Sequence, residues 1–571
     1  MRWGESSCEP LGHECPFGVG EPRQVGDDCG ERDRDAGHGC VGGRGSGRQD
    51  AGQQGVEHSV GQVGVSLLGW GGQQGEDGSV ARSVEHHERA LLVDAQQPGR
   101  REPVHARAQH LDARRPIDGV VLLGGCDKTV PAQLMGATSA DKPALMVTAG
   151  PRQVACWQGE SMTVDDLWPI ADRRRQGLVD DEQWRRLEDC LSPSVGTCNV
   201  LGTAITMAAV AEVLGFALPG SSLPVATGAE RLAIAERTGR RIVATVNEGL
   251  RPRQLVTPAA LENAVRVVCA ISGSTNALIH LTAVAGRAGY HLSLDRLREW
   301  TAGTPVLTDV RPAGQHLLAQ LEQDGGIPAV IRELGDRFGL DCRTATGGAW
   351  RKNLPPAIGS ALSIRSAANA VEETGAIAVL VGNLAPDGAI IKRSAASPHL
   401  LQHVGSALVF DGVDDLQTPI DDPDLLATPD SVLVLRGAGP RGGPGMPEVG
   451  HLPIPRRLLD EGVTDMVRIS DARMSGTATG TVVLHVAPEA AVGGPLALVR
   501  NGDLIRLDVP AGRVDLLVEP AELARRQPTT VAGAAPLRGY DRLHWEHVSQ
   551  APYGCDFDFL RGLSDQENGG D

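Results

Sequence analysis

The sequence predicts an α/β fold: an N-terminal α/β domain built on a parallel sheet and helices, followed by a β-rich, barrel-like C-terminal domain. Three observations lead to this prediction. From residue 117 to about 376, short β-branched runs that end in glycine alternate with apolar runs of helical spacing. Beyond residue 376, short Val/Leu/Ile-rich runs follow one another between Gly, Pro and Asp turns. Residues 1–116 show neither pattern, and we expect them to be poorly ordered.

The first 116 residues have an unusual composition. They contain no Ile, Lys or Tyr and a single Phe, Phe17, while about one residue in five is glycine. A segment so poor in large apolar side chains cannot bury enough surface to form a packed core alone. We interpret residues 1–116 as disordered or as a GC-rich coding region translated in a wrong frame.

Residues 117–376 are expected to form the α/β domain. The runs IDGVVLLGG (117–125) and KPALMVTAG (142–150) predict buried parallel strands. The apolar spacing of NVLGTAITMAAVAEVLG predicts a packed helix that Gly215 closes. Further helices are expected at the following ranges: 259–271, 276–288, and a pair within 313–338 around two adjacent glycines.

Residues 377–540 are expected to form the barrel-like domain, with a tail at 541–571. Its predicted strands lie in the following runs: AIAVLVGN, SALVFDGV, DSVLVLRG, DMVRISDA, GTVVLHVAP and DLIRLDVP.

Composition restricts the function. The chain has 571 residues and a formal charge of −17, which makes nonspecific binding to nucleic acid or to an anionic membrane unfavourable. No signal peptide or membrane-spanning run is apparent, so a cytoplasmic location is expected. Eleven cysteines without a CxxC pair indicate reduced thiols, some of which could bind metal, better than a disulfide framework.

One loop combines three reactive side chains. In GGCDKT, two glycines end a predicted strand, and Cys126, Asp127 and Lys128 follow directly. Ligand sites of α/β sheets lie at such strand ends. A thiolate suits an iron–sulfur cluster, and a carboxylate suits Mg²⁺, so this loop could serve two adjacent metals. Taken alone, the loop is better explained by a small core cysteine followed by a solvated Asp–Lys pair.

Three further loops carry candidates. Cys198, in SPSVGTCNVLG, lies just ahead of the helix that ends at Gly215, where exposed backbone N–H groups would favour thiolate over thiol. Glu448 lies in the rigid loop GPRGGPGMPEVG and suits a Mg²⁺ ligand. Ser475, in DARMSGTATG, lies between two strand-like runs, where a serine could be held close to a metal-bound substrate. Each residue also has an explanation without a functional role. Cys198 could be a helix-start residue, Glu448 could lie in a surface turn, and Ser475 could belong to a Ser–Gly turn.

Together these segments resemble the dihydroxy-acid dehydratase / 6-phosphogluconate dehydratase family. The resemblance covers about residues 117–560 and includes GGCDKTVPAQLMGA, SVGTCNVLGTAITMAAVAEVLG, SGSTNALIHLTAVAGRAG, GNLAPDGAIIK, GPRGGPGMPE and DARMSGTATG in order. Within the family, three motifs look like the sugar-acid branch of arabinonate or xylonate dehydratases: GTCN (196–199), DARMSG (471–476) and GCDFDFL (554–560).

The resemblance implies a role for each candidate. Cys126 and Cys198 would ligate an iron–sulfur cluster, with [2Fe-2S] favoured by the sugar-acid branch and [4Fe-4S] found in the wider family. Asp127 and Glu448 would hold Mg²⁺ together with Lys128, which family members carry as a carbamate. Ser475 would be the base, as an alkoxide. The active site would lie between the two domains, and the assembly would be a homodimer or homotetramer.

Several functions remain open. The favoured one is dehydration of an aldonic acid to a 2-keto-3-deoxy acid, and the first alternative is the dihydroxy-acid dehydratase of branched-chain amino-acid biosynthesis. The second is an inactive product that lacks part of the cluster and Mg²⁺ site, because residues 1–116 contain no motif like the TPCN that carries the family's third cysteine. We nominate none of the cysteines there: Cys8, Cys15, Cys29 and Cys40. A nucleotide-binding protein is disfavoured, since no GxGxxG follows the first predicted strand.

Overall fold

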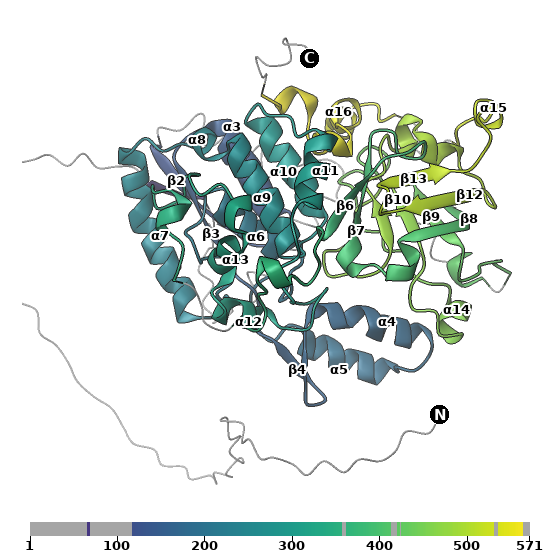
Figure 1. Cartoon of the computed structure of the whole chain (residues 1–571), viewed down its shortest axis with the longest axis horizontal. Coiled ribbons are helices and arrows are strands. Elements are labelled where there is room, and N and C mark those ends of the chain that lie inside the picture. Colours follow the sequence, from purple (N-terminus) through teal and green to yellow (C-terminus); the bar gives the residue numbers. More distant parts are fainter. Residues whose placement is uncertain are drawn as a thin grey trace, which may run out of the picture. The chain divides into compact units, whose positions relative to one another are not determined.

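The computed structural model describes residues 65–68, 117–356, 361–412, 419–422, 424–529 and 535–562, all within one compact unit that spans residues 62–571 (Figure 1). Element labels follow that figure. The predictions for residues 1–64 and 69–116, including the four early cysteines, fall outside the described residues, as does the end of the predicted tail.

A three-stranded parallel sheet has the order β1 (Val65–Leu68), β2 (Gly119–Gly124), β3 (Ala144–Thr148). Val65 pairs with Gly119, and Val120 pairs with Ala144. Strand β1 corrects our expectation of no strand before residue 117. The reason is that its partner β2 lies some fifty residues along the chain, so local periodicity could not reveal the pairing.

Strands β2 and β3 are buried on both faces, which explains their nearly continuous apolar sequences. On one face, Val121 and Leu145 pack with Ile242 of α7 (Ala229–Asn247). On the other, Val120 and Met146 join the main core, to which α3 (Thr129–Ala140) and α6 (Thr203–Val213) contribute. The predicted parallel sheet with flanking helices is confirmed (Figure 1).

The predicted helices are present with slightly different ends. Helix α6 spans Thr203–Val213, and Gly215 follows it with a φ of +85°. Every residue of α6 is buried, so it carries no polar face. The remaining helices of this part are α8 (Pro252–Leu255), α9 (Pro258–Ala270), α10 (Asn276–Arg287), α11 (Leu294–Ala302), α12 (Leu318–Gln323) and α13 (Gly326–Leu334).

A helical arm that the sequence pattern did not predict separates β3 from Cys198. It consists of the hairpin β4 (Ala155–Trp157) and β5 (Glu160–Met162), then α4 (Leu167–Arg175) and α5 (Asp181–Leu191). Asp180 caps α5 by accepting a hydrogen bond from the backbone N–H of Gln183. Three consecutive arginines end α4. Both α4 and α5 contain few apolar residues, so a search for buried segments does not detect these helices.

The C-terminal part contains an eight-stranded mixed sheet in the order β13-β12-β8-β9-β10-β11-β7-β6. Its strands are β6 (Ile377–Leu380), β7 (Ala389–Lys392), β8 (Gln402–Asp411), β9 (Val432–Arg436), β10 (Arg468–Ser470), β11 (Val482–Leu484), β12 (Leu504–Asp508) and β13 (Arg513–Leu516). A bridge between Val381 and Arg513 joins the two edges, so the sheet is nearly closed, as the predicted barrel-like domain requires. Short helices α14 (Arg456–Asp460), α15 (Pro520–Leu523) and α16 (Gly539–His547) complete this part.

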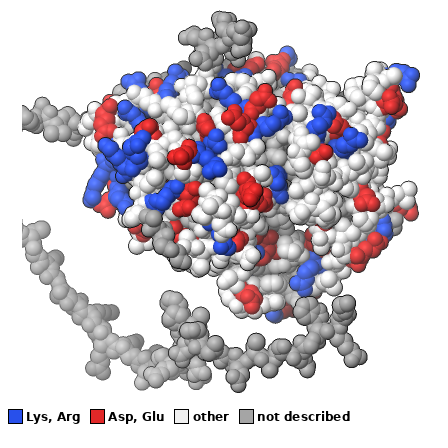
Figure 2. All heavy atoms as spheres, viewed as in Figure 1, with Lys and Arg blue, Asp and Glu red and all other residues white. Residues whose placement is uncertain are grey.

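The outer face of the barrel-like sheet packs against the N-terminal helices. Ile390 of β7 and Leu484 of β11 belong to the same core cluster as α6, α9 and α10, and so does Met474, which precedes Ser475. The turn between β10 and β11 therefore faces the start of α6. Among the described residues, no helix is long and apolar enough to cross a membrane. Acidic and basic side chains are interspersed over the face seen in Figure 2.

Candidate functional site

The loop after β2 bends sharply at Cys126, which has a φ of +70°, a value that residues other than glycine seldom adopt. Such strained residues are common at functional sites. The Cys126 thiol donates to Oδ1 of Asp127 at 2.8 Å, and the Lys128 ammonium donates to Oδ2 of the same carboxylate. Lys128 directly precedes α3. The three side chains that are adjacent in sequence are thus also in contact.

Glu448 joins this group from the distant loop 439–450. Its Oε2 lies 4.0 Å from Nζ of Lys128, and its Oε1 lies 3.9 Å from Nη1 of Arg473. The Asn276 side-chain amide donates to Oε1 at 2.6 Å. Two carboxylates from separate loops therefore converge on one lysine.

The surroundings shift the pKa values of Asp127 and Glu448 in opposite directions. Burial raises the pKa of Glu448, and the charge of Asp127 adds to this, against the opposing charge of Lys128. Burial acts in the same direction on Asp127, but Lys128, the Cys126 hydrogen bond and Arg473 together bring the pKa of Asp127 below its ordinary value. Neighbouring carboxylates that repel one another are the donor set that a divalent cation stabilises.

Cys198 lies beside the same carboxylates. Burial raises the pKa of the Cys198 thiol, and the charges of Asp127 and Glu448 raise it further, while Arg152 opposes them. Our expectation that a helix start would favour the thiolate is wrong, because α6 begins at Thr203, five residues after Cys198. A bound metal would supply the missing positive charge and deprotonate the thiol.

Ser475 occupies the turn between β10 and β11. Its hydroxyl lies 2.9 Å from Oγ1 of Thr477 and accepts a 3.3 Å hydrogen bond from the Thr477 backbone N–H. The turn approaches the start of α6 so closely that a Cβ on Gly476 would lie 2.5 Å from the Thr203 nitrogen. Only glycine fits there, which explains the Ser–Gly pair.

Asn276, the first residue of α10, links these loops. Besides Glu448, its side-chain nitrogen donates to the Met474 carbonyl and to Oγ1 of Thr203, both at 3.1 Å. The structure thus brings together four of the six predicted site residues, namely Cys126, Asp127, Lys128 and Glu448, and ties the Ser475 turn to Glu448 through this amide. Cys198 is near enough for the charges of Asp127 and Glu448 to act on its thiol. Asn276 and Thr477 are not among the predicted site residues, although Asn276 lies in the family-like motif SGSTNALIHLTAVAGRAG. Nothing in one sequence indicates contacts across 172 to 198 residues.

Asp471 holds the loops of the barrel-like sheet in place. This buried carboxylate accepts three backbone hydrogen bonds at 3.0 Å, from Gly437, Ala438 and Ala490. Burial raises its pKa to about 6 from the ordinary 3.8, although these hydrogen bonds oppose the shift. The first two donors begin the segment that leads to Glu448.

We predict that Asp471→Asn destabilises the fold by about 2 kcal/mol, because the amide NH₂ must face a backbone N–H and leaves at least one donor unsatisfied. Since the folded pKa lies above the unfolded one, the proton contributes stability that is present below pH 3.8 and is lost as pH rises through about 6. The asparagine variant should lack this dependence. Urea unfolding across this range checks both points, with Asp460→Asn, an exposed carboxylate on α14, as the control. Equal stability of the two variants would contradict the prediction.

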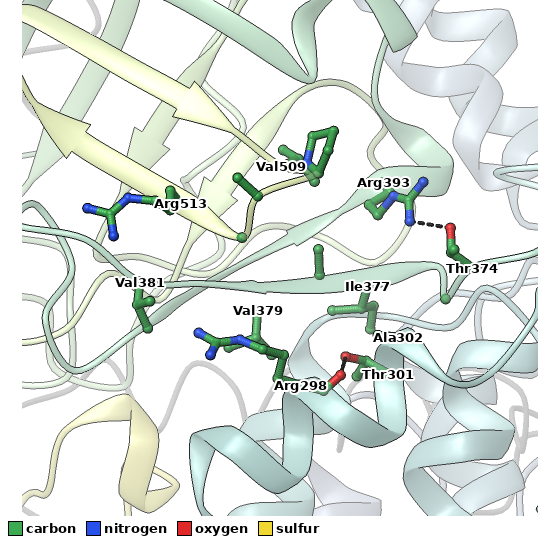
Figure 3. A pocket seen from close by; sticks show the side chains of 15 residues that line it. Arg298, Thr301, Ala302, Thr374, Ile377, Val379, Val381, Arg393, Val509 and Arg513 are labelled. Carbon is green, nitrogen blue, oxygen red and sulfur yellow. Dashed lines mark hydrogen bonds between the residues drawn. The ribbon is translucent and has the colours of Figure 1, made fainter.

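One cavity borders this group of residues, and another lies away from it. A cavity of about 210 Å³ borders Lys128 and Arg473 and reaches His544 and Cys555 of the C-terminal segment. A cavity of about 510 Å³ lies between α11, β6 and the β12–β13 turn, where Arg298, Arg393 and Arg513 line it, and it contains none of the predicted site residues (Figure 3).

In the described part of the chain, no three His, Cys, Asp or Glu side chains are grouped to hold a metal. A divalent cation bound here would therefore have two carboxylates and Lys128 as its nearest protein groups.

Comparison with known proteins identifies close relatives. Two family models match, described as dihydroxy-acid/6-phosphogluconate dehydratase N-terminal over residues 100–353 and C-terminal over residues 363–555. A 6-deoxy-6-sulfo-D-gluconate dehydratase of Pseudomonas putida is 48% identical over 469 residues, which cover 80% of this chain and 79% of that protein. An L-arabinonate dehydratase of Rhizobium leguminosarum bv. trifolii is 45% identical over 456 residues, 78% of each chain. A dihydroxy-acid dehydratase of Acetivibrio thermocellus is 36% identical over 460 residues, 80% of this chain and 82% of that one.

Proposed function

The chain belongs to the dihydroxy-acid/6-phosphogluconate dehydratase family, and we propose that it removes water from an aldonic acid to give a 2-keto-3-deoxy acid. The relatives named for sugar acids are more similar to it, at 48% and 45% identity, than the dihydroxy-acid dehydratase at 36%. The observation that carries the proposal is the convergence of Asp127, Lys128 and Glu448 beside Cys126, with the Ser475 turn tied to them by Asn276.

The donor atoms fit the cofactors on which this family generally depends, an iron–sulfur cluster and Mg²⁺. Asp127 and Glu448 would hold Mg²⁺ through hard oxygen atoms, and carbamylation of Lys128 would turn its ammonium into a further oxygen ligand. Cys126 and Cys198 would supply two thiolates to the cluster, for which we favour the [2Fe-2S] type. When bound, these groups would neutralise the substrate carboxylate and act as a Lewis acid toward the departing hydroxyl.

The residues of the chain would handle the proton. Ser475 would take the proton from C2 of the substrate, which requires that its hydroxyl be ionised. The Thr477 backbone N–H already points at that oxygen and would stabilise the charge. The enol left by loss of the 3-hydroxyl then converts to the ketone. As in the sequence-based prediction, we expect a homodimer or homotetramer.

The direct test is a substrate comparison after anaerobic purification with iron, sulfide and Mg²⁺. We expect L-arabinonate or D-xylonate to form a 2-keto-3-deoxy acid, detected by proton NMR, at a kcat/KM at least about tenfold above that for 2,3-dihydroxyisovalerate. The opposite preference would support the branched-chain alternative. A colourless protein without iron that converts none of these acids would support the inactive alternative.

A further inference from the structure

Ser475 stands at the end of a hydrogen-bonded series that begins in the helical arm. The indole N–H of Trp168, the second residue of α4, donates to Oγ1 of Thr477 at 3.0 Å. That oxygen lies 2.9 Å from Oγ of Ser475. The series joins residues 309 positions apart in the chain, and Trp168 belongs to no motif that the sequence pattern singled out.

The direction of these hydrogen bonds follows from the chemistry of the groups. An indole N–H is only a donor, so the Thr477 oxygen accepts from Trp168. Among the hydrogen bonds of the described residues, the only acceptor available to the Thr477 hydroxyl proton is Oγ of Ser475. When Ser475 is ionised, as its proposed role requires, it has no proton to donate, so its oxygen then accepts from both the hydroxyl and the backbone N–H of Thr477.

We propose that Trp168 is a positioning residue for the Ser475 base. Its indole N–H holds the Thr477 hydroxyl with the proton directed at Ser475, and it polarises that hydroxyl into a stronger donor. A stronger donor stabilises the ionised serine more than the neutral one, since hydrogen bonds to charged acceptors are the stronger ones. The inference rests on the proposed role of Ser475 as the base.

The arm holds Trp168 firmly enough for this role. Just before α4, Asp165 pairs with Arg311 at 3.0 Å. The half-buried indole also meets the ring of His451 edge to face, with 5.2 Å between ring centres. At the far end of α4, Arg175 donates to the Ile454 carbonyl at 2.9 Å. Helix α4 is therefore tied to the N-terminal part before its first turn and to the barrel-like part at its end, and the indole itself contacts the barrel-like part.

Trp168→Phe tests the inference, because it keeps an aromatic ring and removes the N–H. The matched control is Trp184→Phe on α5 of the same arm, where the indole N–H donates to exposed Glu188 at 2.7 Å. We expect Trp168→Phe to lower kcat by about five- to tenfold with little change in KM. The kinetic isotope effect with C2-deuterated substrate should rise, and the acidic limb of the kcat profile should move to higher pH, because the serine becomes harder to ionise. Trp184→Phe should change none of these.

A second measurement does not depend on turnover. The rate at which a fluorophosphonate labels Ser475, followed by mass spectrometry of the peptide, reports the reactivity of its oxygen. We expect labelling to be slower in Trp168→Phe than in the parent chain, and we expect Trp168→Phe to have no further effect when Thr477→Val is already present.

The outcomes separate this inference from the proposed function. Slower labelling with no turnover of any aldonic acid by the parent chain would support the inference while removing the function. Equal labelling rates in the two tryptophan variants, an unlabelled Ser475 in the parent chain, or an undiminished effect of Trp168→Phe in the Thr477→Val background would overturn the inference. A kcat loss accompanied by a fall in melting temperature that Trp184→Phe does not show would assign Trp168 a structural role and overturn it as well.

Discussion

Ser475→Ala is expected to lower kcat for aldonic acid dehydration by about 1,000-fold and to leave the iron content, the visible spectrum and the melting temperature unchanged. The large effect follows from the loss of the proposed base. The small structural effect follows from the surroundings of the side chain, since its hydroxyl makes its hydrogen bonds only with Thr477 among the described residues. Steady-state kinetics and iron analysis on the same reconstituted preparation measure both.

Thr479→Ala is the control for that substitution, because Thr479 is an exposed residue of the same turn. It should retain full turnover. Substantial turnover by the Ser475 variant would remove this serine from its proposed role. Loss of iron together with turnover would show that Ser475 holds the site together and would also contradict the role of a base.

Asp556→Ala should cost about 3–5 kcal/mol of folding free energy, the largest stability effect that we expect. Asp556 and Arg287 of α10 are 1% and 0% exposed, and Nη2 of the arginine donates to the carboxylate at 2.8 Å. Removing the carboxylate leaves a guanidinium buried without its counter-charge. Urea unfolding, read by far-ultraviolet circular dichroism, gives the free energy.

Asp558→Ala, two residues further on, provides the comparison. Its carboxylate pairs with His547 at 3.0 Å, and the two side chains are 60% and 37% exposed. Such a solvent-screened pair contributes little, so the change should stay within about 0.5 kcal/mol. Similar losses in the two variants would mean that the buried pair is not what anchors this segment.

The parts of the fold that the sequence predicted are those with strong local signals. Strands β2 and β3 are continuous apolar runs closed by glycine, and α6 has apolar residues at helical spacing. The missed elements lack such signals. Strand β7 is only four residues long, and α7 presents many charged residues to solvent. Strand β1 depends on a partner far along the chain, so its pairing cannot be read locally.

The predicted site residues are those that are adjacent in the chain or that lie in a recognised motif. Cys126, Asp127 and Lys128 follow one another, and Glu448 and Ser475 lie in motifs that resemble the family. The residues that join the loops were not predicted. Asn276 donates to Glu448 and Met474, and Trp168 donates to Thr477, in each case more than 170 positions away, and such contacts exist only after folding. Their residue types alone are equally common in helices without any such role.

The side-chain amide of Asn276 has two hydrogens but three oxygen neighbours, on Glu448, Met474 and Thr203. The three must share those hydrogens, so a displacement of any one oxygen redistributes the bonding of the other two. A displacement of the Glu448 carboxylate would therefore change the hydrogen bond between Asn276 and the Met474 carbonyl, next to Ser475. An ionised aspartate of the same shape would offer no hydrogens at all, so the amide group, more than the size of the side chain, makes these contacts.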